Sequence, residues 1–297
     1  MKPLLSSRTR PSLLLRGFLS IGLIIAPSGA LAWGELGHRL TAMVAWQALT
    51  PAAREQVLLL HPDVDFAALS TQMDRERPSL MRRYPGSAGW HYVNQSVCNP
   101  QSPPVCPRGH CASHQIERWQ AILADPAEPQ ARRADALAFL VHMIGDIHQP
   151  LHTASHQDRG GNDVKVSGAG PASLTLHQVW DSALVTRAVG QLPPEKWVLR
   201  AVAARRAKHV QWSSGTSMEW IAESARLARK SVYDGLPGFS CDAPMPPRVK
   251  VDDAWLARGT ALVPERIVKA GLRIAATINT ALAPDKQPAA QTDERMP

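Results

Sequence analysis

The chain has 297 residues, of which 44% are hydrophobic and 20% are charged, the balance of an ordinary globular protein and not of a disordered or fibrous one. This length suffices for a sizeable core in one large domain or two small ones. The formal net charge is +8. Downstream of residue 32, no apolar run approaches the roughly 18 residues that span a bilayer, which excludes an integral membrane protein.

The first 32 residues have the three parts of an export signal. Four basic residues precede an apolar stretch at 17–26, and this leader contains no acidic residue. Ala30-Leu31-Ala32 then matches an A-x-A cleavage site. We therefore predict a signal peptide at 1–32 in preference to a buried N-terminal helix, and a mature chain that begins at Trp33. Such a protein is exported, either periplasmic or extracellular. Without the leader, 29 basic residues face 25 acidic ones, so the mature charge is +4.

The chain contains four cysteines, which export would place in an oxidising compartment. Three pairings are open on sequence alone. We favour Cys106–Cys111 as a short local loop and Cys98–Cys241 as a long staple. The spacings do not form a compact zinc-ligand box, so we interpret all four cysteines as structural.

Most of the chain is predicted as helix. Apolar residues at 40, 43, 44 and 48 recur at helical spacing and predict a helix that runs to about Leu49. The segment 98–111 is rich in Pro, Ser and Cys and is predicted as an irregular loop. Alternation of apolar and polar residues at 164–166 and 174–176, with Gly and Pro between, predicts a small β-hairpin near 162–177.

The C-terminal half is also predicted as helical. Thr216 and Glu219 form a plausible capping box that opens a helix towards Tyr233. Pro264 is predicted to start the last helix. The basic segment 197–212 is interpreted as a solvated face in preference to a nucleic-acid patch. The polar, Pro-rich tail at 284–297 is predicted to be disordered, which leaves one mainly α-helical domain at 33–283.

A candidate metal site lies in the segment 134–152. The segment is apolar on nearly every side of its helix, which is typical of a buried helix. His142 and Asp146 are four residues apart and therefore share one face. A buried carboxylate is costly unless it is paired or bound to metal, and no Lys or Arg lies between 133 and 159. A hydrogen-bonded His–Asp pair in the core is the alternative.

Further ligand types surround this pair in the sequence. His152 follows Pro150, which should end the helix, and His177 and Asp181 repeat the four-residue spacing. The remaining candidates come earlier in the chain, and the complete set is Trp33, His38, Asp74, His91, His142, Asp146, His152, His177 and Asp181. Nine nitrogen and oxygen ligands exceed what one tetrahedral zinc ion uses, and they suit three ions with Asp146 bridging two of them.

Trp33 enters this set through its backbone. Cleavage after Ala32 would free an α-amino group that can chelate a divalent ion together with the Trp33 carbonyl oxygen. The ordinary pKa of an α-amino group, near ~8, allows deprotonation at a metal. Processing would therefore complete the site.

These motifs resemble the zinc-dependent, single-strand-preferring nucleases of the S-one/P-one family, which includes mung bean nuclease. The resemblance covers residues 33–181 in the family's order and the helical remainder is consistent with it. The matching segments are WGELGH (33–38), MDRER (73–77), WHYVN (90–94), FLVHMIGDIHQPLH (139–152), DRGGND (158–163) and LHQVWD (176–181).

The resemblance implies a mainly α-helical fold of the zinc phospholipase C and single-strand nuclease type with three Zn²⁺ ions. One ion would be held by Asp74, His91, His142 and Asp146, and a second by Trp33, His38 and Asp146. The third would be held by His152, His177 and Asp181.

The implied activity is hydrolysis of RNA and single-stranded DNA to 5′-phosphorylated products, with removal of 3′-phosphates from nucleotides, by a monomer. We assign Asp74, Asp146 and Arg77 to catalysis, and Arg77, Tyr92, Asn94 and Asn162 to substrate binding. Tyr92 would stack on a base. Asn94 stands where family members often carry Asp, so a base preference cannot be carried over.

Two other functions are considered. A zinc phospholipase C-type phosphodiesterase has a similar fold and cluster, but it has Glu where this chain has Asp181 and lacks the DRGGND insertion. A binding protein with purely structural zinc is disfavoured because such sites are usually rich in cysteine. The histidines excluded from the ligand set are His61, His110, His114, His148, His156 and His209.

Overall fold

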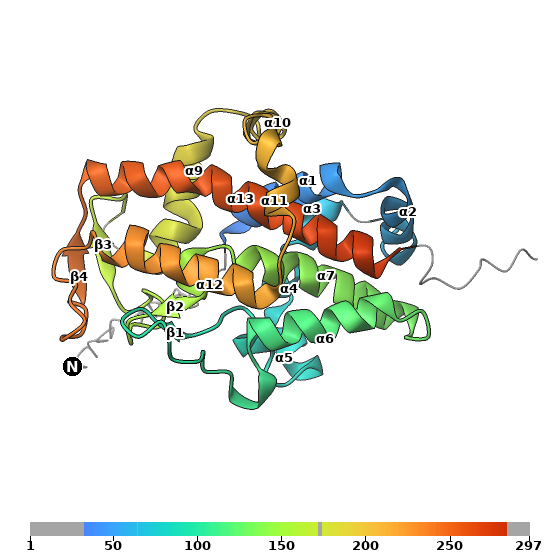
Figure 1. Ribbon diagram of the computed structural model, residues 1–297, viewed down its shortest axis with the longest axis horizontal. Helices are drawn as coiled ribbons and strands as arrows, with labels where there is room; N and C mark the ends of the chain where they lie inside the picture. Colours follow the sequence, from blue (N-terminus) through green and yellow to red (C-terminus); the bar gives the residue numbers. More distant parts are fainter. Residues whose placement is uncertain (1–32, 64, 172–173, 284–297) are drawn as a thin grey trace, which may run out of the picture.

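The computed structural model describes residues 33–63, 65–171 and 174–283, so the predicted leader and tail lie outside the described residues. Helices form most of this structure, as predicted (Figure 1). The longer elements are α1 (Glu35–Ala48), α2 (Pro51–Leu60), α3 (Phe66–Leu69), α4 (Gln72–Arg75), α5 (Arg77–Arg83), α6 (Ala112–Ala124), α7 (Gln130–Asp146), α8 (Leu176–Gln178), the π-helical η4 (Val179–Ala183), α9 (Leu184–Val189), α10 (Pro194–Ala203), α11 (His209–Trp212), α12 (Ser217–Leu227), the π-helical η6 (Ala228–Tyr233) and α13 (Asp253–Ala281).

Short elements connect these helices. They are the single 3₁₀ turns η1 (Ser87–Gly89), η2 (Pro107–Gly109), η3 (Pro150–His152) and η5 (Arg206–Lys208), and the strands β1 (Gln95–Ser96), β2 (Ala154–Ser155), β3 (Lys165–Ser167) and β4 (Arg248–Lys250). Within the described ranges, no helix has both the length and the apolar character that crossing a bilayer requires.

The long helix α13 packs along α1, and the two cross closely at Gly271. A Cβ atom at this position would overlap the Val44 side chain and lie 2.7 Å from the Thr41 carbonyl oxygen. Only glycine therefore permits this approach. The contact fixes α1, whose first turns carry part of the candidate site.

The start of α13 differs from the prediction. The helix begins at Asp253, where the side chain of Asp252 accepts a hydrogen bond from the Trp255 backbone N–H at 2.7 Å. Pro264 lies inside the helix and does not start it. A proline inside a helix removes one backbone hydrogen bond and costs about 3 kcal/mol, which the contacts of α13 with α1, α7 and α9 offset.

The other helix predictions are confirmed. The helix at 40–49 is α1, the buried helix is α7, and the capping box of Thr216 and Glu219 opens α12, which continues through η6 to Tyr233. Two apolar clusters form the core. One surrounds α6 and α7 with Trp119 against Phe139, and the other surrounds α9 and α13 with Trp180 against Trp255.

The predicted hairpin is present in part. The backbone N–H of Val166 donates to Leu174 and that of Leu176 donates to Val164, so the two segments run antiparallel. The strand partner of β3, however, is the distant β4, in parallel register. A second parallel pair joins β1 to β2. Both pairs are too short to form a sheet layer.

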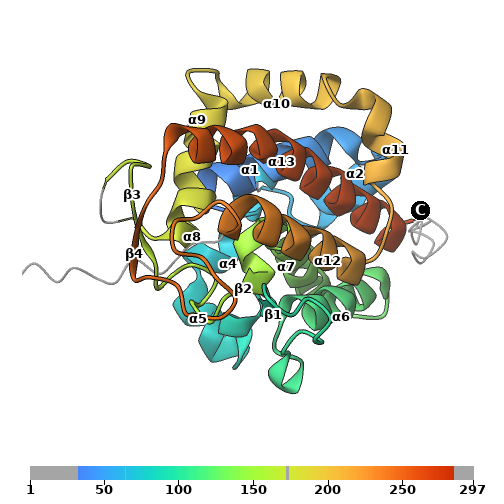
Figure 2. The same ribbon diagram turned by 60° about the vertical axis from the view of Figure 1, so that its left-hand side comes forward.

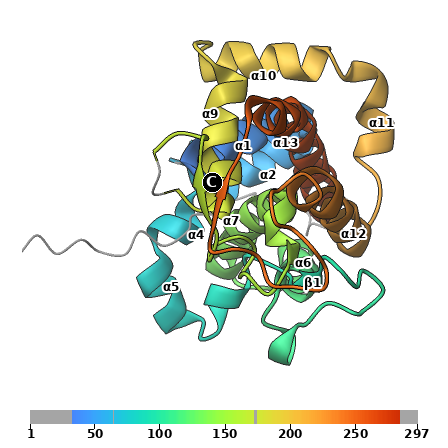
Figure 3. The ribbon, with the colours of Figure 1, turned by 90° about the vertical axis from the view of Figure 1, so that its left-hand side faces the viewer.

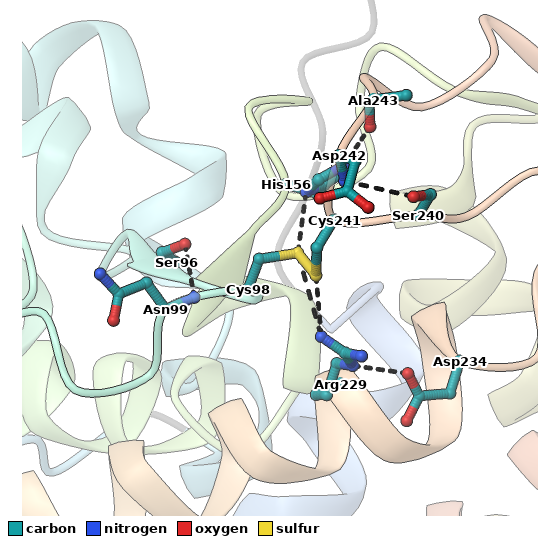
Figure 4. The surroundings of a disulfide bond; sticks show 10 residues. All are labelled: Ser96, Cys98, Asn99, His156, Arg229, Asp234, Ser240, Cys241, Asp242 and Ala243. Carbon is teal, nitrogen blue, oxygen red and sulfur yellow. Dashed lines mark hydrogen bonds and ion pairs between the residues drawn. A yellow bond between two sulfur atoms is a disulfide. The ribbon is translucent and has the colours of Figure 1, made fainter.

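Both favoured disulfides are present, Cys98–Cys241 and Cys106–Cys111. Figure 4 shows the first bridge, with Arg229 on one side and His156 on the other. The Arg229 guanidinium lies 3.0 Å from the sulfur of Cys241. Cys98 follows β1, and β1 pairs with β2, which begins two residues after His152. The bridge therefore restrains the chain next to the candidate site.

Candidate metal centre

The candidate site lies where α7 ends. Asp146 is the last residue of α7 and is fully buried. The other side chains reach it from α1, α4, the segment before β1, η3, α8 and η4. Figure 3 looks along α13 and shows α4 and α7 below α1. The structure thus assembles this site from distant parts of the chain.

Asp146 is the centre of the first group of polar atoms. One carboxylate oxygen lies 3.1 Å from Nε2 of His38. The other lies 3.2 Å from Nε2 of His142 and 3.0 Å from Nδ1 of His91. One carboxylate therefore faces three imidazole rings on two sides, which is the arrangement expected of a bridging ligand.

Asp74 completes a second group with His91 and His142. Its two carboxylate oxygens lie 4.0 Å from Nδ1 of His91 and 3.8 Å from Nε2 of His142. These three side chains, and separately His38, His142 and Asp146, have ligand atoms within 4.8 Å of one another. Asp74 is on the short helix α4, which the preceding helix α3 places against α7.

The third group contains His152, His177 and Asp181, again with ligand atoms within 4.8 Å. The Asp181 oxygens lie 3.8 Å from Nε2 of His152 and 3.3 Å from Nε2 of His177. Asp181 is in the π-helical turn η4, and π-helical turns are frequent at functional sites.

The ring orientations in the third group favour a bound cation. Nδ1 of His152 donates to the His91 carbonyl and Nδ1 of His177 donates to the Gly160 carbonyl, each at 2.7 Å. In a neutral imidazole the other nitrogen then carries a lone pair. The two Nε2 atoms nevertheless lie only 3.1 Å apart, beside a carboxylate. Two lone pairs in this position repel unless a positive charge lies between them.

A proton does not suit this position. Burial lowers the pKa of His152 to about 3, and it also lowers the pKa of His177. Burial raises the pKa of Asp181 well above its usual range, and the charge of Asp146 adds to the effect. The two histidines therefore remain neutral, and Asp181 resists ionisation. A bound divalent cation would stabilise the ionised carboxylate and would accept the lone pairs of both neutral imidazoles.

Ionisation in the first group depends on the opposing charges. Burial would raise the pKa of Asp146, but His142 and His152 outweigh it and hold that pKa well below its usual range. Burial would likewise lower the pKa of His142, but Asp146 and Asp74 raise it to about 9. For His38, burial and the neighbouring His142 lower the pKa.

Several buried polar atoms of the site have no hydrogen-bond partner among the described residues. Such atoms are rare in folded proteins and usually mark an unseen ligand, water or ion. They are Nδ1 and Nε2 of His38, Nε2 of His91, and one carboxylate oxygen each of Asp74, Asp146 and Asp181. Nε2 of His38 and the Asp146 oxygen lie 3.1 Å apart but do not have the geometry of a hydrogen bond. Imidazole nitrogens and carboxylate oxygens are ligands of zinc, so the residues present fit a zinc cluster.

Trp33 lies beside the third group. It is fully buried, and the next backbone N–H, that of Gly34, donates to the Asp181 carbonyl at 2.8 Å. A side chain at Gly34 would overlap Ser182. The backbone of residues 33 and 34 therefore lies against η4, with His38 one turn further along α1.

Two positioning groups were missed by the sequence reasoning. Gln149 donates from its amide nitrogen to Asp181 at 2.7 Å, which orients that carboxylate. Gly160, at φ +62°, offers its carbonyl to His177, and a Cβ there would overlap the Leu151 carbonyl oxygen. Both lie inside quoted motifs, so the signal was present, but neither has a side chain that binds metal strongly.

The residues predicted to contact substrate lie at the edge of the centre. The guanidinium of Arg77 lies 3.9 Å from Asp74 and is about one-third exposed. Tyr92 and Asn94 are both exposed, two residues apart in the extended segment after His91. The amide nitrogen of Asn162 donates to the Arg159 carbonyl at 2.9 Å, so this group stabilises its own loop.

None of the six excluded histidines belongs to the three groups. His148, two residues after Asp146, instead belongs to a second buried cluster, which we call the Arg266 cluster. Its members share hydrogen bonds between α12, α13 and the end of α7, and they are His148, Glu223, Ser224, Arg266, Lys269 and Arg273.

Comparison with known proteins identifies the family. The family model described as S1/P1 Nuclease matches residues 33–283. Endonuclease 2 of Arabidopsis thaliana is 26% identical over 280 residues, which cover 88% of this chain and 94% of the relative. Nuclease S1 of Aspergillus oryzae is 27% identical over 274 residues, covering 83% and 91%.

A shorter match joins the chain to Nuclease P1 of Penicillium citrinum, 28% identical over 166 residues, covering 53% of this chain and 60% of the relative. The family model extends over both core clusters and all three groups of polar atoms. The chain belongs to the S1/P1 nuclease family and is a hydrolase that acts on phosphoester bonds.

Proposed function

We propose that this protein is a three-zinc phosphodiesterase that cleaves RNA and single-stranded DNA to 5′-phosphorylated products and removes 3′-phosphates from nucleotides. The observation that carries the proposal is the pair of Nε2 atoms of His152 and His177, which face each other at 3.1 Å beside Asp181. A cation bound between the two nitrogen atoms would relieve that contact. The membership of the S1/P1 nuclease family supplies the reaction class.

The proposal has three ligand sets, which the three groups of polar atoms support. Asp74, His91, His142 and Asp146 would hold one zinc ion, and Trp33, through its amine and carbonyl, would hold the second with His38 and Asp146. The remaining set is His152, His177 and Asp181. When bound, zinc supplies Lewis acidity towards phosphoryl oxygens and lowers the pKa of water. The protein's own part is to hold the ligands in a water-poor pocket, because nearly all of them are buried.

Arg77 would bind the phosphate. Its contact with Asp74 fixes the guanidinium at the edge of the centre while leaving about one-third of the side chain exposed. A planar guanidinium can donate two parallel hydrogen bonds to phosphate oxygens. It would therefore orient the phosphodiester and stabilise the charge that develops on it.

Tyr92 and Asn94 would contact the base. The Tyr92 ring is 42% exposed although His91 beside it is buried. An exposed aromatic face stacks on any base that is not already stacked in a duplex, which accounts for a preference for single strands. Asn94, on the same side of the extended segment, offers both a donor and an acceptor, and the amide oxygen of Asn162 is a further acceptor.

Export is part of the proposal. Two disulfides require an oxidising compartment, such as the periplasm or the cell exterior. Removal of residues 1–32 would create the α-amino group that the second zinc site uses. We also propose that the protein acts as a monomer.

The test uses protein whose N-terminus has been sequenced and whose metal content has been measured by mass spectrometry. It is offered denatured DNA, RNA, 3′-AMP and a phosphatidylcholine emulsion. We expect about three zinc ions per chain, 5′-phosphorylated products from both nucleic acids, and loss of all activity in EDTA that zinc restores. The protein should not cleave the phosphatidylcholine.

Two histidine substitutions, one inside the metal centre and one outside it, provide a matched comparison. His177→Ala should remove one metal and abolish cleavage, whereas His114→Ala, an exposed histidine outside the three groups, should leave both unchanged. Metal-free protein with full activity, or cleavage of phospholipid in place of nucleic acid, would overturn the proposal.

A further inference from the structure

Residues 194–212 form a helical arch on the outside of the molecule. They comprise α10, η5 and α11, and we call them the basic arch. Figure 2 shows α10 lying across the top of the structure and α11 turning down beside the end of α13. Trp197 and Val198 anchor α10 in the second apolar cluster, so the arch is a fixed part of the fold.

The basic arch carries a concentrated positive charge. Its 19 residues include five basic side chains and one acidic one, Glu195, for a net charge of +4. That value equals the net charge of the whole chain after residue 32. The rest of the mature sequence is therefore balanced, and the excess charge lies on a single arch.

Four of these cations are free to bind an external anion. Lys196, Arg200, Arg206 and Lys208 are exposed, and no carboxylate in the described part of the chain forms an ion pair with them. Exposed cations without an ion pair among the described residues also occur elsewhere, for example Arg82, Lys230 and Lys250. The arch differs because it has four of them within the 13 residues 196–208.

Apolar side chains stand among these cations. Val210 is 88% exposed and Leu199 is 59% exposed. Exposed apolar residues next to unpaired cations give a surface that can contact both the charged backbone and the apolar base faces of a nucleic-acid strand.

The basic arch packs on α1, the helix that carries His38. Glu195 and Leu199 of the arch line a hollow of about 440 Å³ together with Met43 of α1 and Asp65. Asp65 is paired with Arg39, which directly follows His38 in α1.

We propose that the basic arch is a second binding surface for the single-stranded substrate, which holds the part of the strand that extends beyond the metal centre. This inference rests on the proposed function. The ligand class is a single-stranded polyanion several nucleotides long, and the arch binds its backbone without reading sequence. We expect dinucleotides and 3′-nucleotides to bind at the metal centre without contacting the arch.

A nucleic-acid strand fits the arch better than an anionic membrane. Membrane-surface helices present a broad apolar face with cations along its edges. In the arch the apolar faces of α10 are buried in the core, and its outer surface has four free cations against two apolar side chains. The substrate of a nuclease is itself a polyanion, so the charge match needs no additional partner.

The test compares two triple variants of the zinc-loaded enzyme. The arch variant is Arg200→Glu, Arg206→Glu and Lys208→Glu. The control variant makes the same change in charge on exposed cations away from the arch, Lys230→Glu, Arg248→Glu and Lys250→Glu. Binding of a hydrolysis-resistant phosphorothioate thymidine 30-mer is followed by fluorescence anisotropy, and hydrolysis of a thymidine dinucleotide is measured in parallel.

The arch variant is expected to bind the 30-mer at least about tenfold more weakly at low salt. The slope of log affinity against log salt should fall by about 2, since each lost cation contributes about 0.7 for single strands. Dinucleotide hydrolysis should stay within about twofold of the wild type in both variants, and the control should bind the 30-mer nearly as well as the wild type.

Three results would overturn the inference. They are an unchanged 30-mer affinity in the arch variant, an equal loss in the control variant, and a loss of binding to phosphatidylglycerol vesicles without any effect on the 30-mer. If the wild type fails to hydrolyse the dinucleotide, the proposed function is wrong, and the binding measurement still decides whether the arch holds a polyanion.

Discussion

Two buried polar clusters contact the segment 146–152, and they differ in how their polar atoms are satisfied. In the Arg266 cluster each buried side-chain atom has a hydrogen-bond partner within the described residues. In the metal centre, six buried atoms on His38, His91, Asp74, Asp146 and Asp181 have none. An unsatisfied buried polar atom costs about 1–3 kcal/mol. The Arg266 cluster satisfies its own polar atoms, whereas the metal centre needs bound ligands to satisfy those it contains.

The Arg266 cluster fixes the backbone that the metal centre uses. Nε of Arg266 donates to the His148 carbonyl at 3.0 Å, and Ser224 donates to the Ile147 carbonyl at 2.5 Å. Arg273 donates to Nε2 of His148 at 2.8 Å, and Nδ1 of that ring donates to the Ile144 carbonyl. The turn that follows Asp146 is therefore held from behind by side chains that never reach the metal centre.

The largest expected effect comes from the centre itself. Asp146→Asn should lower kcat/KM for single-stranded DNA by about three orders of magnitude, because a shared metal ligand supports several kcal/mol of transition-state stabilisation. Zinc content per chain should fall as well. Both are measured by steady-state kinetics and metal analysis of the purified variant.

Asp135→Asn is the matched control for this substitution. Asp135 lies on the same helix, α7, and its side chain forms hydrogen bonds with Arg83 and Tyr84. Its activity should remain within about twofold of the wild type. Equal losses in the two variants would mean that Asp146 has no special role in the centre.

An intermediate effect on stability is expected in the other cluster. Arg266→Met removes a buried cation and leaves its partners unpaired, which should lower the free energy of unfolding by about 3 kcal/mol in a urea titration. The variant should keep its zinc, since Arg266 contacts no candidate ligand side chain. Arg226→Met, on the exposed side of α12, should change stability by less than about 0.5 kcal/mol. If Arg266→Met lost zinc but kept its stability, the result would contradict the stabilising role assigned to the Arg266 cluster.

The smallest effect is a pH dependence in the Arg266 cluster. Burial would raise the pKa of Glu223, but Arg266, Arg273 and Lys269 outweigh it and hold that pKa below its usual range. A depressed pKa stabilises the folded state above the unfolded pKa of glutamate, about 4.3, and the contribution disappears as the pH falls.

The measurement compares the wild type with Glu223→Gln at saturating zinc. The variant should be less stable at pH 7, and the difference in unfolding free energy should shrink between pH 5 and pH 3. A difference that grows on acidification would contradict the charge assignment. Any metal lost at acid pH affects both proteins and so does not contribute to the difference.

The sequence predicted the metal centre better than it predicted the elements around it. Ligand residues must be His or carboxylate and must stand at defined spacings, so His142 with Asp146 and His177 with Asp181 could be recognised locally. Placement of the groups in space required the whole fold, because Asp74 and His91 reach α7 only through the packing of α3 and α4.

Features that depend on long-range contacts were predicted less well. Pro264 was assigned to a helix start because proline favours that position, yet contacts of α13 with α1 and α9 keep it inside a helix. Glu223 and Arg266 are 43 residues apart and have no motif. The basic segment 197–212 could be recognised as charged, but the absence of acidic partners became visible only with the described neighbours in place.

The Cys98–Cys241 bridge closes a covalent ring of the chain, since its cysteines are 143 residues apart. His142, Asp146, His152, His177 and Asp181 all lie inside this ring, and His91 lies seven residues before it. An unfolded but oxidised chain thus keeps most of its metal ligands tethered, and the loop-entropy relation gives about 5 kcal/mol for such a closure. When the oxidised chain refolds, its ligands should therefore meet around zinc more readily than those of a chain whose bridge has been reduced.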